Sequence, residues 1–326
     1  MAWPTQCDVL RSFTAGADGA RPFRRVPRWP IPGQMNNTVV PAAQAESAGF
    51  AFVRELAASL SGGPIELPSF PDVALRVQQV LADDAVSTEM VVRIVGAEPM
   101  LAARVVSLAN SAAMNPSSHQ VTDLRTAVSR MGFDSLRAAA VSFAIAQLRS
   151  RDDYASIEQQ LTQQWLDSVT FASTACVVAR RSGRMSADTA LFAALVAGVG
   201  KVYILTRASH HAELFADPGA YQSIVKEWHI SIARALLESW HVAGEVIEAV
   251  QAYEQRNEET RPGPPLADVL ACAALVNGFH DTPELLAAVL PNSRAAQRLG
   301  LANAAPATLL ADAASELAML NAALGR

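Results

Sequence analysis

The sequence predicts an all-α fold, and three observations lead to this prediction. Apolar residues recur at helical spacing from about residue 50 to the end of the chain. No stretch alternates apolar and polar residues as a half-buried strand would, and no segment repeats at a fixed period. With 51% hydrophobic and 17% charged residues among 326, the chain can bury a full core.

Helix start and stop signals accompany the apolar faces of the first half. Ser87 is a candidate N-cap, and Pro99 stands where a helix would begin. Thr122 is expected to cap a helix that Gly132 ends, and Asp134 to cap the next one. The apolar faces comprise Phe52, Val53, Leu56 and Leu60; Val73, Val77, Val80 and Leu81; and Leu101, Val105 and Leu108.

The second half continues in the same way. Ser186 is expected to open one apolar helix running through Val199, and Thr189–Gly200 within it carries no charge. A membrane-spanning helix needs about 20 residues, so this stretch is interpreted as a buried core helix. Other faces carry Ile157, Leu161, Trp165 and Val169; Ile224, Trp228, Ile232, Leu236 and Trp240; Val246, Ile247 and Val250; Leu266, Leu270 and Val276; and Leu309, Leu310, Ala313, Leu317, Leu320 and Leu324.

Charge and cysteine content narrow the function classes. The net charge is −5, so the composition offers no overall electrostatic footprint for DNA or RNA. Cys7, Cys176 and Cys272 lie far apart, which argues against a disulfide framework or a structural zinc site. The expectation is a cytoplasmic protein without membrane contact.

The first 45 residues differ from the rest of the chain. The segment from Arg21 to Gly33 holds four prolines and four arginines, which prevent regular structure. Residues 1–45 are therefore expected to be a disordered tail. A second interpretation stays open, in which translation starts at Met35 and the preceding residues are not native.

Common catalytic motifs are absent from the sequence. It contains no Gly-x-Ser-x-Gly, no P-loop and no His-Glu-x-x-His. Gly198 and Gly200 lack the third glycine of a dinucleotide motif and are interpreted as small residues that allow close helix packing. The adjacent His210 and His211 diverge by about 100° on a helix, which suits a surface loop better than a metal site.

A helix-turn-helix is the DNA-binding alternative. Residues 122–148 could form the helix pair, and Arg125, Arg130, Arg137 and Arg149 could contact phosphates. The second helix is nearly all apolar from residue 138 to 145, whereas a recognition helix needs polar residues that face the groove. This pattern argues against DNA readout.

The first half contains Leu67-Pro-Ser-Phe-Pro71 and, further on, Pro99 and Leu101 in a helix that ends in Asn110-Ser111. Together these motifs resemble the opening of an HDOD domain, a relative of the HD phosphohydrolases. Leu67-Pro-Ser-Phe-Pro71 is similar to the family's Leu-Pro-x-x-Pro entry. Pro99, Leu101, Asn110 and Ser111 fit the family's Asp-Pro-x-Leu helix that ends in Asn-Ser, with Glu98 in place of Asp. Taken by themselves, Asn110 and Ser111 suit a structural role at a helix end. The resemblance covers roughly residues 50–285.

The resemblance also locates the metal-binding positions of HD enzymes. Leu195-Val-Ala-Gly-Val-Gly-Lys-Val202 is similar to the family's Leu-Leu-His-Asp-Ile-Gly-Lys-Leu, so Ala197 and Gly198 replace the His-Asp dyad. Neither replacement has a side-chain donor atom. The other corresponding positions are Asp167 and Ser168, the retained His229 with Trp240 downstream, Tyr253 and Glu254, and a region near Ala274.

The resemblance implies a degenerate pocket in a two-lobed helical protein. The expected pocket residues are Asp167, Ala197, Gly198, Lys201, His229, Tyr253 and Glu254. No catalytic residue, metal or cofactor is expected, and a small ligand has no support in the sequence. The expected parts are a tail (1–45), an N-terminal lobe (46–150), a degenerate HD-like lobe (151–290) and a C-terminal helix (291–326).

The functional expectation is a non-catalytic regulatory scaffold of bacterial signal transduction that binds a partner protein. One alternative is a residual metal-dependent phosphohydrolase that uses His229 with Asp167 and Glu254. A DNA-associated regulator is the other alternative. The sequence leaves the partner, the pathway and the oligomeric state open.

Overall fold

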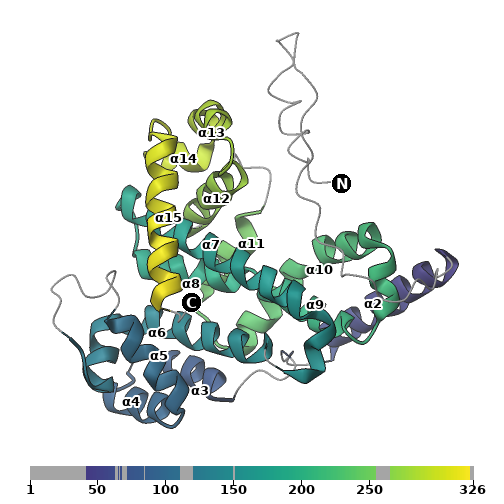
Figure 1. Cartoon of the computed structure of the whole chain (residues 1–326), viewed down its shortest axis with the longest axis horizontal. Helices are drawn as coiled ribbons and strands as arrows, with labels where there is room; N and C mark the ends of the chain where they lie inside the picture. Colours follow the sequence, from purple (N-terminus) through teal and green to yellow (C-terminus); the bar gives the residue numbers. More distant parts are fainter. Residues whose placement is uncertain are drawn as a thin grey trace. The chain divides into compact units, whose positions relative to one another are not determined.

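The structure is a computed structural model whose regular elements, within the residues described, are all helices (Figure 1). It describes residues 42–62, 65, 67, 72–83, 85–110, 120–149, 151–254 and 265–323. The predicted all-α fold is therefore confirmed, and residues 40–326 form one compact unit. Residues 1–41 of the predicted tail lie outside the described residues, whereas residues 42–45 already belong to helix α2.

Among the residues that the structure describes, the first half contributes five α-helices. They are α2 (Ala42–Ser61), α3 (Asp72–Leu81), α4 (Thr88–Gly96), α5 (Pro99–Ala109) and α6 (Leu124–Arg149). Helices α3, α4 and α5 all pack against α6. Ser87 caps α4 through its hydroxyl, which accepts a hydrogen bond from the Met90 amide, and Pro99 is the first residue of α5. Both predicted start signals are confirmed.

The start of α6 differs from the prediction by one residue. Oδ1 of Asp123, not the Thr122 hydroxyl, accepts a hydrogen bond from the Thr126 amide at 2.9 Å. Gly132 interrupts α6 with φ 73° and ψ 170°, so two helices meet there as expected. Asp134 follows this break, where it accepts hydrogen bonds from Arg137 Nη1 at 2.8 Å and Thr189 Oγ1 at 2.7 Å. The hydrogen bond from Thr189 therefore joins α6 to α8 (Ala187–Ala197).

Asn110 has the structural role that its position at a helix end suggests. Its Oδ1 accepts a hydrogen bond from the Val121 amide at 2.7 Å, and its Nδ2 donates to the Val121 carbonyl at 2.7 Å. Nδ2 also donates to the Val106 carbonyl at 3.0 Å. One side chain thus ties the end of α5 to the segment that leads into α6. Ser111 lies outside the described residues.

Helix α7 is the central element of the second half. This half comprises η1 (Asp152–Ile157), α7 (Glu158–Ser182), α8 (Ala187–Ala197), α9 (Val199–Ala208), η2 (Ala212–Ala216), α10 (Pro218–Ser239), α11 (Gly244–Ala252), α12 (Pro265–Gly278), α13 (Pro283–Val289), η3 (Leu290–Asn292), α14 (Arg294–Arg298) and α15 (Pro306–Ala323). Helix α7 packs against α8, α12 and α15, and Figure 1 shows α15 in yellow beside it. The predicted C-terminal range, 291–326, thus holds both α14 and α15.

The apolar helix predicted from Ser186 is two helices. Ser186 caps α8 as expected, but α8 ends at Ala197, and α9 starts at Val199 after Gly198. The combined span Ala187–Ala208 is long and apolar enough to cross a membrane by composition, yet 83% of its most apolar window is buried inside the fold. Such burial is typical of a core helix, as the sequence interpretation proposed.

Gly200 sets the approach of α9 to α10. A Cβ at this position would lie 2.0 Å from the His229 carbonyl oxygen and 2.9 Å from the Ala233 amide nitrogen. Only glycine allows the two backbones to come this close. The interpretation of Gly200 as a close-packing residue is therefore confirmed.

The adjacent histidines occupy different environments. His210 is exposed, whereas Nε2 of His211 lies 3.0 Å from Oε2 of Glu55 in α2. The His211 ring also packs edge-on against Phe52, with a centroid distance of 5.3 Å. Both histidines lie in the turn between α9 and η2, as the sequence predicts, and His211 also links this turn to α2.

Candidate functional site

The two positions of the lost dyad lie at the junction of α8 and α9. Ala197 is the buried last residue of α8, and Gly198 follows it. A Cβ on Gly198 would lie 2.9 Å from Ser168 Oγ and 3.1 Å from Gln164 Nε2 of α7. These two side chains fill the space into which a larger residue at position 198 would project.

His229 lies on α10 with its side chain 5% exposed. Its Nε2 is 3.2 Å from Oε2 of Glu254, which follows the end of α11. Its Nδ1 is buried without a hydrogen-bond partner among the described residues. The imidazole therefore makes one polar link, which is directed to a carboxylate.

The carboxylate of Glu254 makes polar contacts with three other side chains. Tyr253 donates its hydroxyl to Oε1 at 2.7 Å, and Lys201 Nζ lies 3.9 Å from the same oxygen. The Tyr253 ring packs against Phe171 of α7, with centroids 5.5 Å apart. Together with His229, these contacts join α7, α9, α10 and the end of α11.

The surroundings of Glu254 fix its protonation state. Burial favours the neutral carboxyl, but the hydrogen bond with His229, the charge of Lys201 and the Tyr253 hydroxyl outweigh this effect and lower the pKa to about 2. Burial, followed by the adjacent Glu254 charge, raises the pKa of Tyr253 well above its usual value. At neutral pH the pair is thus a carboxylate and a protonated phenol that donates to it.

The structure separates Asp167 from this group. Asp167 is exposed on α7 and accepts a hydrogen bond from Gln163 Nε2 at 2.8 Å. Its neighbour Ser168 is buried and faces Gly198, because consecutive helix residues diverge by about 100°. Ala274, the counterpart of the final acidic ligand, is also exposed.

The residues present do not fit the metal that HD-type sites hold. Ala197 and Gly198 supply no donor atom, and the Nε2 of His229 and both oxygens of Glu254 are engaged with protein groups. Within the described ranges, no three His, Cys, Asp or Glu side chains come together in a way that could hold a metal ion. The arrangement can link helices through Glu254, while the buried Nδ1 of His229 has no partner among the described residues.

Of the seven expected pocket residues, the structure brings four together, because Lys201, His229 and Tyr253 each contact Glu254. Ala197 and Gly198 sit at the helix junction. Sequence reasoning missed Gln164, which helps to fill the space beside Gly198. Gln164 could have been found from its spacing, because it precedes Ser168 by four residues and therefore lies on the same face of the helix.

Comparison with known proteins gives consistent results for the fold. A "Putative metal-dependent phosphohydrolase" from Shewanella amazonensis SB2B is 24% identical, with a TM-score of 0.59 over 82% of this chain and 99% of that chain. An HDOD domain protein of unknown function from Geobacter sulfurreducens is 21% identical, with a TM-score of 0.55 over 86% of this chain and 97% of that one.

A third solved structure carries a different name. It is a "Putative signal transduction protein" from Marinobacter aquaeolei VT8, 18% identical, with a TM-score of 0.51 over 86% of this chain and 68% of that chain. No curated protein matches the sequence. Residues 67–256 match the HDOD domain, so more than half of the chain is accounted for by one family, and the chain belongs to the HDOD family.

Proposed function

We propose that this HDOD protein is a pseudoenzyme, a non-catalytic regulatory scaffold of the bacterial cytoplasm that acts by binding a partner protein in signal transduction. The observation that carries this proposal is the chemistry of the dyad positions. Ala197 and Gly198 offer no ligand atoms, and Ser168 and Gln164 of α7 occupy the adjoining space. A residue without a side-chain donor atom cannot supply the imidazole or carboxylate ligand of such a site.

The engagement of the retained polar residues supports the same function. His229, Tyr253 and Lys201 all act on Glu254, whose negative charge is balanced by the Lys201 ammonium. Catalytic groups need polar atoms that face a substrate, whereas these atoms face one another. The cluster therefore acts as a polar link between helices.

The names of the similar structures point in two directions. The Shewanella protein is named for phosphohydrolase chemistry and the Marinobacter protein for signal transduction. Identities below 25% relate folds and leave activity to experiment. The choice between these two functions therefore rests on the residues of this chain.

A hydrolysis assay tests the non-catalytic part of the proposal. The full chain and His229→Ala are incubated with aryl phosphomonoesters, phosphodiesters and nucleotides in the presence of manganese, iron, nickel or zinc. The expected result is the same background rate for both proteins. Hydrolysis that the wild type performs and His229→Ala loses would support the residual phosphohydrolase instead.

Crosslinking tests the scaffold part. The full chain is crosslinked in a bacterial lysate, with and without nuclease, and the products are identified by mass spectrometry. The proposal expects a protein complex that survives nuclease treatment and that reassembles from purified components. Association that nuclease abolishes, together with a salt-dependent gel shift, would favour the DNA-associated regulator.

A further inference from the structure

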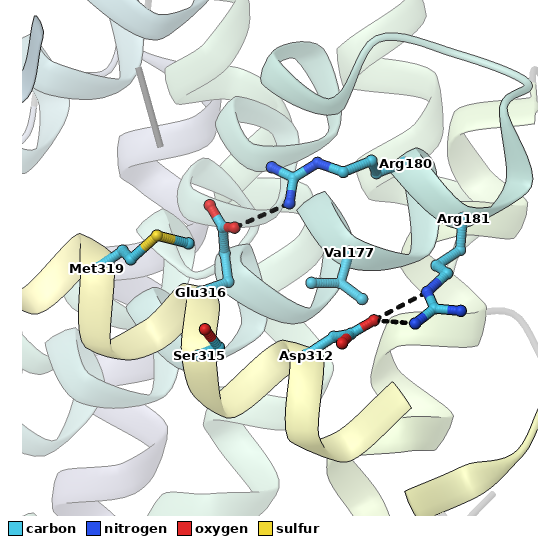
Figure 2. Close-up of a pocket in the computed structure, with 7 residues that line it drawn as sticks. All are labelled: Val177, Arg180, Arg181, Asp312, Ser315, Glu316 and Met319. Carbon is cyan, nitrogen blue, oxygen red and sulfur yellow. Dashed lines mark hydrogen bonds and ion pairs between the residues drawn. The ribbon is translucent and has the colours of Figure 1, made fainter. Parts of the chain in front are cut away.

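Helix α15 packs against α7, and two ion pairs form part of this contact (Figure 2). Nη1 of Arg180 lies 3.0 Å from Oε2 of Glu316, and Nε of Arg181 donates to Oδ2 of Asp312 at 2.8 Å. Asp312 and Glu316 are four residues apart, so both carboxylates project from the same face of α15. The two consecutive arginines of α7 thus bind a pair of carboxylates that are spaced by about one helical turn.

The inner of these two ion pairs is costly to bury. The Glu316 side chain is 3% exposed, whereas that of Arg180 is 56% exposed. Cys176 contributes a thiol 3.6 Å from Oε1 of Glu316. Because a buried carboxylate loses its hydration, replacing such a pair by well-packed apolar residues is often neutral or stabilising. The ion pair therefore fixes the position of α15 on α7 more than it adds to stability.

The packing between the two helices is incomplete. A cleft of about 260 Å³ lies along the seam, with Val177 and Met319 as its apolar lining beside the charged residues (Figure 2). The cleft opens to solvent, because the Arg180 and Arg181 side chains that line it are 56% and 45% exposed. A helix with larger side chains at these positions would fill this seam better than α15 does.

We propose that Val177, Arg180 and Arg181 form a docking groove for an acidic amphipathic helix of a partner protein, and that α15 occupies this groove as an internal substitute. The partner helix carries two carboxylates at i and i+4, which pair with the arginines, and a bulky apolar residue that fills the cleft. Helices that lay an apolar face into a groove commonly use this spacing.

The α7 side of the groove is compatible with release of α15. Arg180 and Arg181 remain hydrated when the groove opens, and the non-helical segment between α14 and α15 contains Gly300 at φ 73°. Helix α15 also touches α13, α12 and α5, so exchange is expected to lift part of the helix. This inference rests on the proposed scaffold function, and it identifies the surface to which the partner protein binds.

Alkylation of Cys176 reports whether the groove opens. Burial is the main cause that raises the pKa of this thiol to about 12, so it reacts slowly while Glu316 covers it. The full chain is treated with N-ethylmaleimide, and the Cys176 peptide is quantified by mass spectrometry. Asp312→Lys, which places two cations together, is expected to speed this labelling about tenfold.

Matched variants make the labelling specific. The double variant Arg181→Glu, Asp312→Lys exchanges the charges and should return the rate toward that of the wild type. Glu238→Lys breaks an exposed ion pair with Arg234 on α10 and should leave the rate unchanged. If circular dichroism shows that Asp312→Lys does not fold, the milder variant Asp312→Asn replaces it. Asp312→Asn should speed labelling two- to threefold.

A peptide competition then tests the occupant. A labelled peptide of residues 306–323 should bind the Asp312→Lys chain at least fivefold more tightly than the wild type and slow its Cys176 labelling. The same peptide with Asp312→Lys should prefer the Arg181→Glu chain. Labelling that no Asp312 variant accelerates, or a peptide that neither binds nor protects, would overturn the docking groove. Neither result bears on hydrolysis, so the two proposals fail separately.

Discussion

Nε2 of His229 lies 3.2 Å from Oε2 of Glu254, and this contact joins α10 to the end of α11. The same histidine contributes its backbone carbonyl to the close approach of Gly200 on α9. An imidazole that the family resemblance would assign to a metal thus has a structural use in this protein.

Glu254→Gln should change how stability depends on pH. The pKa of Glu254 is about 2 in the fold against an ordinary value of 4.5, so its contribution is present above pH 4.5 and is lost as the pH falls toward 2. Wild type should lose about 3 kcal/mol more than Glu254→Gln across this range. Denaturant unfolding at several pH values checks this, and parallel curves for the two proteins would contradict it.

His229→Ala should lower the free energy of unfolding at pH 7 by roughly 1–3 kcal/mol, because it leaves Glu254 buried without one of its partners. Partner binding should be retained. His280→Ala is the matched control, since the His280 side chain is 66% exposed. Unchanged stability combined with lost binding would instead identify the cluster as the functional site.

Gly200→Ala should destabilise the protein by about 3 kcal/mol, because the new Cβ meets backbone atoms of α10 that cannot move aside. The control is Gly278→Ala in α12, where a Cβ meets nothing within 4 Å. That change should stay within about 1 kcal/mol of the wild type. Thermal melts of both variants provide the comparison, and equal melting temperatures would contradict the account of α9 packing.

Removal of the N-terminal residues should leave stability nearly unchanged. A chain that begins at Met35 or Gln44 is expected to melt at nearly the same temperature as the full chain, because the proline-rich segment offers little apolar surface. A chain that begins at Pro64 lacks α2 with its buried Phe52 and Leu56, and should melt several degrees lower. A comparable loss from the shorter deletions would show that Trp3, Phe23 or Trp29 docks on the core.

Local signals predicted much of the helical pattern. Ser87, Pro99, Gly132 and Ser186 mark helix boundaries because a cap or a backbone conformation depends on the residue itself. The break at Gly198 was missed, because glycine within an apolar run also suits an uninterrupted helix. The family resemblance placed the HDOD fold, which the match over residues 67–256 confirms.

Contacts between distant segments could not be predicted from the sequence. Arg180 and Glu316 are 136 positions apart, and only the packing of α15 on α7 brings them together. Asp167 and Ser168 show a finer limit, since one step along α7 decides which side chain faces Gly198. Periodicity gives the buried face of a helix, but the partner of each residue depends on the tertiary arrangement.

The metal content of the purified full chain is the most direct test of the central claim that the HD chemistry is lost. The protein is equilibrated with manganese, iron, nickel and zinc in turn, freed of unbound ions, and analysed by elemental mass spectrometry beside His229→Ala. The account predicts no stoichiometric metal in either protein, because Ala197 and Gly198 provide no ligand. About one ion per chain in the wild type, lost in His229→Ala, would contradict it.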